Sequence, residues 1–316
     1  MSEITHRTIA TNGINMHIAE QGEGPLVVLV HGFPELWHAW RHQLPALADA
    51  GYHAVAPDVR GYGRTDAPEP VEGYSMVNMT ADIVGLLDAL GEETAVVIGQ
   101  DWGSDIAWRT ALLYPERFTA VVALSVPFMP RPPVPPIQMF KQIFADTFMW
   151  ILYFQEPGVA EAELEADVRR SISVMFYAAS GDAPRGSGMP AKKKGAGLLD
   201  GLPEPRLPMP WFTEADLEYF VGEFERTGFR GAFNRYRNMD RDWEELPQLA
   251  DAKVQQPALF IAGEHEVMPT LFGTDAMREH VPNLQDVITL PGCGHWAQQE
   301  RPVEVSTALI QFLKGL

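Results

Sequence analysis

Short apolar runs alternate with amphipathic segments along most of the sequence, and this alternation constrains the fold more than any other feature. Six runs of four or five residues are apolar almost throughout, which is typical of parallel strands covered on both faces. They are residues 26–30, 53–56, 95–98, 121–124, 258–261 and 287–290. Helical patterns between them, such as residues 76–90, predict an α/β protein with a mostly parallel, doubly wound sheet. Asn12-Gly13 between two alternating segments predicts an antiparallel hairpin at the sheet edge.

The alternation stops between residues 124 and 258, which predicts a helical insertion. A stiff proline-rich connector at 131–136 is followed by helical patterns at 137–154, 158–178 and 213–227. Glu161, Glu163 and Glu165 in the second pattern are expected to form a solvated helix face. Residues 180–210 are dense in glycine and proline and predict a loop, with a flap over a pocket as the alternative. We expect a core of residues 1–127 and 247–316 and a helical lid of residues 128–246.

Charge and cysteine content exclude several classes of function. The chain has 24 Lys and Arg against 42 Asp and Glu, a net charge of −18, which repels nucleic acids and anionic membrane surfaces. Its single cysteine, Cys293, rules out an intrachain disulfide and a cysteine-based zinc cluster. The N-terminal residues show no apolar signal segment, so a cytoplasmic protein without a membrane partner is expected. The sequence is compatible with a monomer or a homodimer.

A five-residue turn between a predicted strand and a predicted helix carries the first candidate for catalysis. Residues 95–98 lead into Gly99-Gln-Asp-Trp-Gly103, and a helical pattern follows. Small residues two positions before and two positions after a central nucleophile are typical of a nucleophile elbow, because the strained turn leaves no space there for larger side chains. The central residue is Asp101, so the predicted nucleophile is a carboxylate. An aspartate that only caps the helix is the simpler alternative.

The loop after the first buried strand predicts an oxyanion hole beside this elbow. His31-Gly-Phe-Pro-Glu35 directly follows residues 26–30. The backbone N–H groups of Phe33 and Trp102 can therefore converge on a developing oxyanion. We expect a cis Phe33–Pro34 bond, because a sharp turn is needed to direct the amide inward. An ordinary tight turn is the alternative.

A general base and an acid that orients it are expected late in the chain, because the order in hydrolases with such an elbow is nucleophile, acid, histidine. His295 follows the last predicted strand within Gly292-Cys-Gly-His-Trp296 and is the candidate base. The loop after residues 258–261 offers two acids, Glu264 and Glu266.

Over nearly its whole length the chain resembles the soluble epoxide hydrolases of the α/β-hydrolase fold. The resemblance is carried by His31-Gly-Phe-Pro-Glu35, Asp58-Val-Arg-Gly-Tyr-Gly-Arg64, Gln100-Asp-Trp-Gly103, Tyr153-Phe-Gln-Glu-Pro-Gly158, Gly228-Phe-Arg-Gly231, Tyr236-Arg-Asn-Met239 and Cys293-Gly-His-Trp296. The segments at Tyr153 and Tyr236 are the most specific, and the resemblance implies that both are lid tyrosines facing the nucleophile. It also favours Glu266 as the acid, at the last position of Gly-x-x-acid, where many members carry aspartate.

An aspartate at the elbow favours displacement at a saturated carbon over acyl transfer. Asp101 can open an epoxide by attacking carbon while the two phenols, protonated at pH 7, donate to the oxygen. His295, oriented by Glu266, would then activate water to hydrolyse the ester, and the product would be a vicinal diol. This scheme needs neither a metal nor an organic cofactor.

Other functions remain open on the same residues. A haloalkane or haloacid dehalogenase shares the Asp-His-acid arrangement, although Phe33 stands where haloalkane dehalogenases usually carry asparagine. A non-catalytic small-molecule receptor on this fold is a further alternative. If the partner is an epoxide, Trp37 and Pro34 are candidate substrate contacts because they adjoin the predicted chemistry. Aromatic residues of the lid line an apolar tunnel or form the lid core: Phe140, Phe144, Phe148, Trp150 and Phe154.

Overall fold

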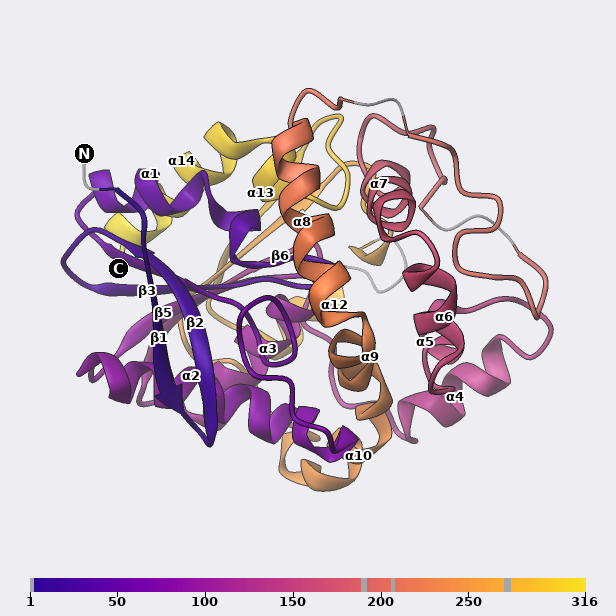
Figure 1. Ribbon diagram of the computed structural model, residues 1–316. Coiled ribbons are helices and arrows are strands. Elements are labelled where there is room, and N and C mark those ends of the chain that lie inside the picture. The colour runs from indigo at the N-terminus through magenta and orange to yellow at the C-terminus, as the bar shows by residue number, and fades with distance from the viewer. Residues whose placement is uncertain (1–2, 189–191, 206–207, 270–273) are drawn as a thin grey trace.

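Eight strands form one sheet in the computed structural model, which describes residues 3–188, 192–205, 208–269 and 274–316 (Figure 1). The order across the sheet is β1-β2-β4-β3-β5-β6-β7-β8. The first two strands form the predicted edge hairpin, β2 pairs antiparallel with β4, and every later pairing is parallel. The strands span Thr5–Thr11, Ile14–Gln21, Leu26–Val30, His53–Pro57, Ala95–Gln100, Phe118–Leu124, Ala258–Gly263 and Leu284–Leu290. The predicted mostly parallel α/β sheet is confirmed.

Helices cover both faces of the sheet, because successive side chains of a strand point to opposite sides. In β3, Val27 and Leu29 belong to a core formed with helices α1 and α14. Val28 and Val30 belong to the opposite core, formed with α2 and α3 and continuous with the lid. Among the described residues, the helices outside the insertion are α1 (Gln43–Asp49), α2 (Met76–Leu90), α3 (Trp102–Leu113), α12 (Asp275–His280), α13 (Ala297–Glu300) and α14 (Pro302–Lys314), with short 3-10 helices η1 (Trp37–Trp40), η2 (Val71–Tyr74) and η3 (Pro247–Leu249).

Helices α4 to α10 follow β6 and precede β7, and in Figure 1 helices α4 to α7 lie on the side away from the β1–β2 hairpin. They span Pro136–Ile143, Trp150–Tyr153, Val159–Glu165, Val168–Ala178, Glu214–Thr227, Arg230–Arg237 and Met239–Glu245. This places a helical insertion where the sequence predicts one. The domain limits at residues 127/128 and 246/247 stay predictions.

Two of the predicted lid helices are interrupted. The pattern at 137–154 breaks after α4, because Thr147 forms a β-bridge with Lys193 and the amide of Phe148 donates to the carbonyl of Lys192 (3.0 Å). The pattern at 158–178 breaks at Asp167, whose side chain caps α7 by accepting from the amide of Arg170 (2.9 Å). Periodicity alone does not detect these breaks, because the apolar spacing continues across them.

The acidic residues of α6 are not simply solvated, contrary to the sequence-based expectation. Glu161 is 8% exposed and pairs with Arg237 at 2.7 Å. The exposed Glu165 accepts a hydrogen bond from the amide of Phe229 (3.0 Å). These carboxylates therefore connect separate segments of the lid. Within the described ranges, no helix combines the length and apolarity needed to cross a lipid bilayer.

Candidate active site

Asp101 lies at the crowded turn between β5 and α3, in a strained backbone conformation. Its φ is +53°, which is rare for a residue with a side chain and indicates local strain. A Cβ on Gly99 would lie 1.9 Å from the carbonyl oxygen of Gly103, and one on Gly103 would lie 2.0 Å from that of Val30. The side chain of Asp101 makes no capping hydrogen bond to α3, so the helix-cap alternative is not supported.

The loop after β3 brings a backbone donor onto this carboxylate. The amide of Phe33 donates to Oδ1 of Asp101 at 2.9 Å, and the Phe33–Pro34 bond is cis, as expected. Gly32 permits this approach, because a Cβ there would lie 2.5 Å from Oδ1 of Asp101. Oδ1 is thus the oxygen that faces the predicted oxyanion hole.

His295 lies between two carboxylates. Its Nδ1 is 2.5 Å from Oε2 of Glu266, and its Nε2 is 3.6 Å from Oδ2 of Asp101. The other oxygen of Glu266 accepts from the amide of Val267 at 2.8 Å, which fixes the carboxylate. Glu264 points elsewhere: its side chain is 45% exposed and pairs with Arg185 at 2.9 Å. Of the two acids left open by the spacing, the structure sets Glu266 against the imidazole.

The backbone of His295 is held by residues to which the sequence analysis gave no supporting role. Gln100 Nε2 and Ser125 Oγ both donate to the carbonyl of His295, at 3.0 and 2.8 Å. The amide of His295 donates to the carbonyl of Ala179 in the lid at 2.8 Å. A Cβ on Gly294 would lie 2.4 Å from that same carbonyl oxygen, so glycine is needed for lid contact. Gln100 is the last residue of β5 and Ser125 directly follows the neighbouring β6, and this position was the signal available in the sequence.

Burial and neighbouring charges shift the protonation of the three central groups. Burial raises the pKa of Asp101, and the charge of His295 and the amides of Phe33 and Trp102 only partly offset it. Burial disfavours the imidazolium of His295, but the carboxylates of Glu266 and Asp101 outweigh it and raise the pKa to about 9. Burial acts against the charged form of Glu266 too, yet His295 and the hydrogen bonds it receives lower its pKa.

Glu35 is a further buried carboxylate that the sequence analysis placed in a motif without giving it a role. Its side chain is fully buried and accepts hydrogen bonds from Gln298 and Gln299, at 3.0 and 2.7 Å. Burial raises the pKa of Glu35 to about 7, with the Asp101 charge acting in the same direction and His295 against it. Glu35 therefore adds to the negative potential around His295 when it is ionised.

Tyr236 of α9 approaches the elbow from the lid. It is 5% exposed, and its ring packs edge-on against Trp102 and Phe33 with centroids 5.0 and 5.9 Å apart. Burial raises the pKa of Tyr236 well above the ordinary value, and the carboxylate of Asp101 contributes in the same direction. The phenol therefore stays protonated over the physiological range and can donate a hydrogen bond.

Tyr153 at the end of α5 belongs to the same aromatic group, but its hydroxyl is engaged elsewhere. The ring lies 6.2 Å from Phe154, which in turn lies 4.9 Å from Tyr236. The Tyr153 hydroxyl donates to Oε2 of Glu163 at 2.7 Å. In this conformation its single proton does not face Asp101, in contrast to the orientation implied by the resemblance.

The candidate substrate contacts are buried beneath the lid. Trp37 donates from Nε1 to the hydroxyl of Tyr219 in α8 at 2.6 Å and is 7% exposed. Pro34 is buried next to Phe33. Phe154 stacks on Phe233 at 4.4 Å and is 1% exposed, which favours the lid-core alternative for this aromatic residue.

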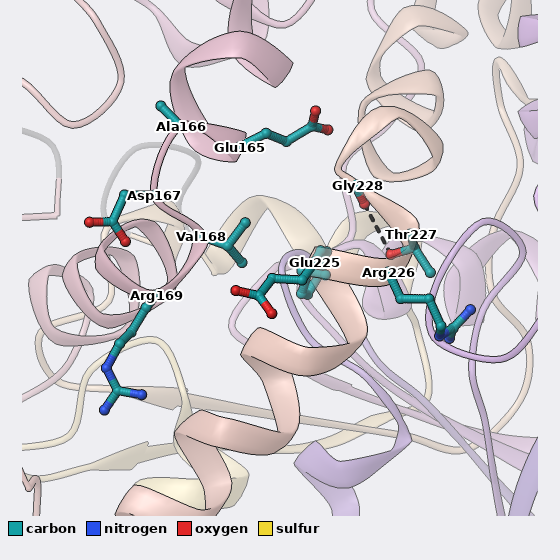
Figure 2. Close-up of a pocket in the computed structure, with 10 residues that line it drawn as sticks. Glu165, Ala166, Asp167, Val168, Arg169, Glu225, Arg226, Thr227 and Gly228 are labelled. Carbon is teal, nitrogen blue, oxygen red and sulfur yellow. Dashed lines mark hydrogen bonds between the residues drawn. The ribbon is translucent and has the colours of Figure 1, made fainter.

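A surface hollow between the α6–α7 junction and the end of α8 is shown in Figure 2. It is lined by Glu165, Ala166, Asp167, Val168, Arg169, Phe224, Glu225, Arg226, Thr227 and Gly228. None of these belongs to the predicted site, so the hollow is separate from the elbow. Among the residues that the structure describes, no group of three or more His, Cys, Asp or Glu is arranged to hold a metal ion.

The fold and the elbow define the class of this protein. Residues 25–159 match the family described as the alpha/beta hydrolase fold. Epoxide hydrolase A of Mycobacterium tuberculosis (strain ATCC 25618 / H37Rv) is 46% identical over 319 residues, covering 100% of this chain and 99% of the relative. Epoxide hydrolase 2 of Siraitia grosvenorii is 41% identical, covering 99% of both. The chain therefore belongs to the epoxide hydrolases of this fold.

Solved structures agree with this assignment. The crystal structure of Epoxide Hydrolase A from Mycobacterium thermoresistibile superposes with a TM-score of 0.95 at 47% identity, covering 99% of each chain. An epoxide hydrolase from an endophytic Streptomyces gives a TM-score of 0.95 at 48% identity, covering 99% of this chain and 96% of that one. The predicted membership of the epoxide hydrolase family is confirmed.

Proposed function

We propose that this epoxide hydrolase converts a small-molecule epoxide to a vicinal diol through an ester formed on Asp101. The observation that carries the proposal is the position of the Asp101 carboxylate between the Phe33 amide and His295 Nε2. One oxygen is held by a backbone donor, while the other faces the imidazole. A carboxylate arranged in this way can attack carbon with Oδ2 and keep Oδ1 in the oxyanion hole.

Ring opening neutralises Asp101, because its carboxylate becomes an ester. As Oδ2 bonds to the epoxide carbon, the carbon–oxygen bond breaks and the oxygen takes a proton from a lid phenol. Tyr236 is the better placed donor, because it packs against Trp102 at the elbow. Tyr153 is the second proposed donor, after rotation away from Glu163. General-acid assistance of this kind contributes roughly 10²–10⁴-fold.

The same step prepares His295 to act as a base. In the free enzyme the surrounding carboxylates raise the pKa of His295 to about 9, so the imidazole is protonated at neutral pH. Esterification removes the negative charge of Asp101, which lowers the pKa of His295. The imidazolium can return its proton to the tyrosinate left by ring opening. Neutral His295 then faces the ester.

Hydrolysis restores the resting charges. Neutral His295, oriented by Glu266, takes a proton from water, and the hydroxide attacks the carbonyl carbon of the Asp101 ester. The Phe33 and Trp102 amides stabilise the oxyanion on Oδ1; removing one such donor typically costs about 10²–10³-fold. When the tetrahedral intermediate collapses, its own hydroxyl proton passes to the departing oxygen of the diol. Asp101 is left ionised and His295 protonated, as at the start.

Trapping of the ester tests this mechanism. His295→Gln is incubated with a panel of epoxides, and the peptide containing Asp101 is examined by mass spectrometry. We expect a mass increase equal to that of the epoxide, located on Asp101 and absent in the Asp101→Asn, His295→Gln double variant. An adduct on another residue, or its persistence in the double variant, would contradict the proposal.

The predictions about substrate contacts, cellular location and oligomeric state accompany this mechanism. Trp37 and Pro34 are proposed substrate contacts, because both are buried and lie in the segment around Phe33, whose amide holds Asp101. A cytoplasmic location and a monomeric or homodimeric state stay predictions. Halide release measured beside diol formation separates the proposed reaction from dehalogenation.

A further inference from the structure

Glu300, the last residue of α13, is a buried carboxylate that accepts hydrogen bonds from the backbone on both sides of His295. It is 6% exposed. Its Oε1 accepts from the amides of Gly294 and Trp296, both at 3.2 Å. Its Oε2 accepts from the amide of Gly294 at 3.0 Å and from that of Gly181 in the lid at 2.8 Å. One carboxylate therefore holds the residue before the proposed base, the residue after it, and a segment of the lid.

The lid packs closely against the loop that Glu300 holds. A Cβ on Gly181 would lie 2.2 Å from the carbonyl oxygen of Gly292 and 2.9 Å from Oε2 of Glu300. The indole of Trp296 donates to the carbonyl of Phe176 in α7 at 2.8 Å, and the two rings stack with centroids 4.5 Å apart. Glu300 thus lies where the lid meets the loop that carries the histidine.

We propose that Glu300 is a positioning residue for ester hydrolysis, which places Nε2 of His295 against the Asp101 ester by holding the backbone on both sides of the histidine. The inference rests on the proposed function, in which His295 is the base. Glu266 fixes only Nδ1 of the imidazole, so the ring can still pivot about that nitrogen if the loop shifts. Displacement of a reacting group by about 1 Å can cost about 10²-fold in rate.

A carboxylate is suited to this position because both of its oxygens act only as acceptors. Burial raises the pKa of Glu300, and the amides of Gly181, Gly294 and Trp296 act against that shift by stabilising the charged form. In Glu300→Gln one oxygen becomes an NH2 group, which would face a backbone N–H donor. The substitution therefore removes an acceptor from this backbone with little change in side-chain volume.

The test measures ring opening and ester hydrolysis separately in single turnovers. We expect Glu300→Gln to slow ester hydrolysis by about 10- to 100-fold and to leave ring opening within about threefold, so that the ester accumulates. In the His295→Gln background the same substitution should slow the residual hydrolysis by no more than about twofold, because it acts through the histidine. A merely structural role would slow both steps together, or would slow hydrolysis equally in both backgrounds.

Glu300→Asp is measured beside Glu300→Gln and carries the test if the glutamine variant does not fold. It keeps the charge but shortens the side chain by one methylene, so the carboxylate no longer reaches every amide. We expect the same selective slowing of ester hydrolysis, by about 3- to 10-fold.

Asp82→Asn is the matched control for the loss of a buried carboxylate. Asp82 is 2% exposed and accepts from Arg60 and Asn12, at 2.8 and 2.9 Å. This substitution should lower the melting temperature and leave both steps within about twofold. A control that slowed ester hydrolysis as selectively as Glu300→Gln would overturn the proposal.

The remaining outcomes separate this inference from the proposed function. If His295→Gln slows ester hydrolysis but the Glu300 variants slow neither step, or slow both alike, the positioning role is wrong and the role of His295 as base stands. If His295→Gln leaves ester hydrolysis unchanged, both are wrong.

Discussion

His295 Nε2 lies 3.6 Å from Oδ2 of Asp101, just beyond hydrogen-bonding distance, while Nδ1 lies 2.5 Å from Glu266. The imidazole is therefore oriented by the acid and not by the nucleophile. This spacing suits a histidine that acts on the ester after the nucleophile has reacted, because Oδ2 keeps its position for attack on carbon. The structure therefore leaves Oδ2 of Asp101 free for the first proposed step, attack on carbon, and holds His295 on Glu266 for the second, hydrolysis of the ester.

Replacing the orienting acid should slow ester hydrolysis far more than ring opening. In Glu266→Gln the imidazole loses the carboxylate at Nδ1, and hydrolysis should fall by about 10²- to 10⁴-fold. Stopped-flow and single-turnover measurements separate the two steps. Glu264→Gln, on the surface near Arg185, is the matched control and should remain within about twofold of the unaltered chain. Equal effects of the two substitutions would contradict the assignment of the acid.

The charge of His295 should make folding stability depend on pH. Its pKa is raised from the ordinary 6.5 to about 9, so the folded state binds the proton more tightly than the unfolded chain. This contribution, at most about 3 kcal/mol, is fully present below about pH 6.5 and is lost as the pH rises through about 9. Urea denaturation of the chain and of His295→Gln at steps from pH 7 to 9.5 measures it. A stability difference that stays constant over this range would contradict the prediction.

Removing both phenols should stop ring opening without unfolding the lid. The double variant Tyr153→Phe, Tyr236→Phe keeps the aromatic packing around Phe154, with Tyr236 4.9 Å away, and loses only the hydroxyl donors. We expect ester formation to slow by roughly 10²–10⁴-fold or more. Diol formation and the melting temperature are measured together. Full activity in the double variant would show that the proton comes from another group.

The contact between the His295 loop and the lid should tolerate no side chain at Gly294. A Cβ there would lie 2.4 Å from the carbonyl oxygen of Ala179, which accepts from the amide of His295. Gly294→Ala should therefore cost about 1–3 kcal/mol and lower activity, because the histidine loses its backbone support. Denaturant unfolding and diol formation are the measurements.

A second glycine provides the control for this substitution. Gly222 is exposed within α8, and a Cβ there would have nothing within 4 Å. Gly222→Ala should stabilise the chain by about 0.5–1 kcal/mol through its higher helix propensity and leave activity unchanged. If both substitutions behaved alike, close packing at Gly294 would not be the cause.

Local sequence patterns were sufficient for the elements of the sheet and for the elbow. The strand at Leu26–Val30 and the helix at Met76–Leu90 have the predicted limits, because continuous apolarity and helical periodicity are properties of neighbouring residues. Small residues around Asp101 likewise follow from the local crowding of the turn. The lid was less predictable. The break after α4 depends on Lys192 and Lys193, which are distant along the chain.

The sequence by itself determined the α/β architecture, the helical insertion and the identity of the carboxylate at the turn, since each depends on residues close together in the chain. Only the tertiary structure decided between Glu264 and Glu266, because both occupy one loop and differ in which side chain turns inward. Only it showed that Glu163 accepts a hydrogen bond from the Tyr153 hydroxyl. Such hydrogen bonds join segments that are brought together by packing. The spacing of residues along the chain does not predict which segments will meet.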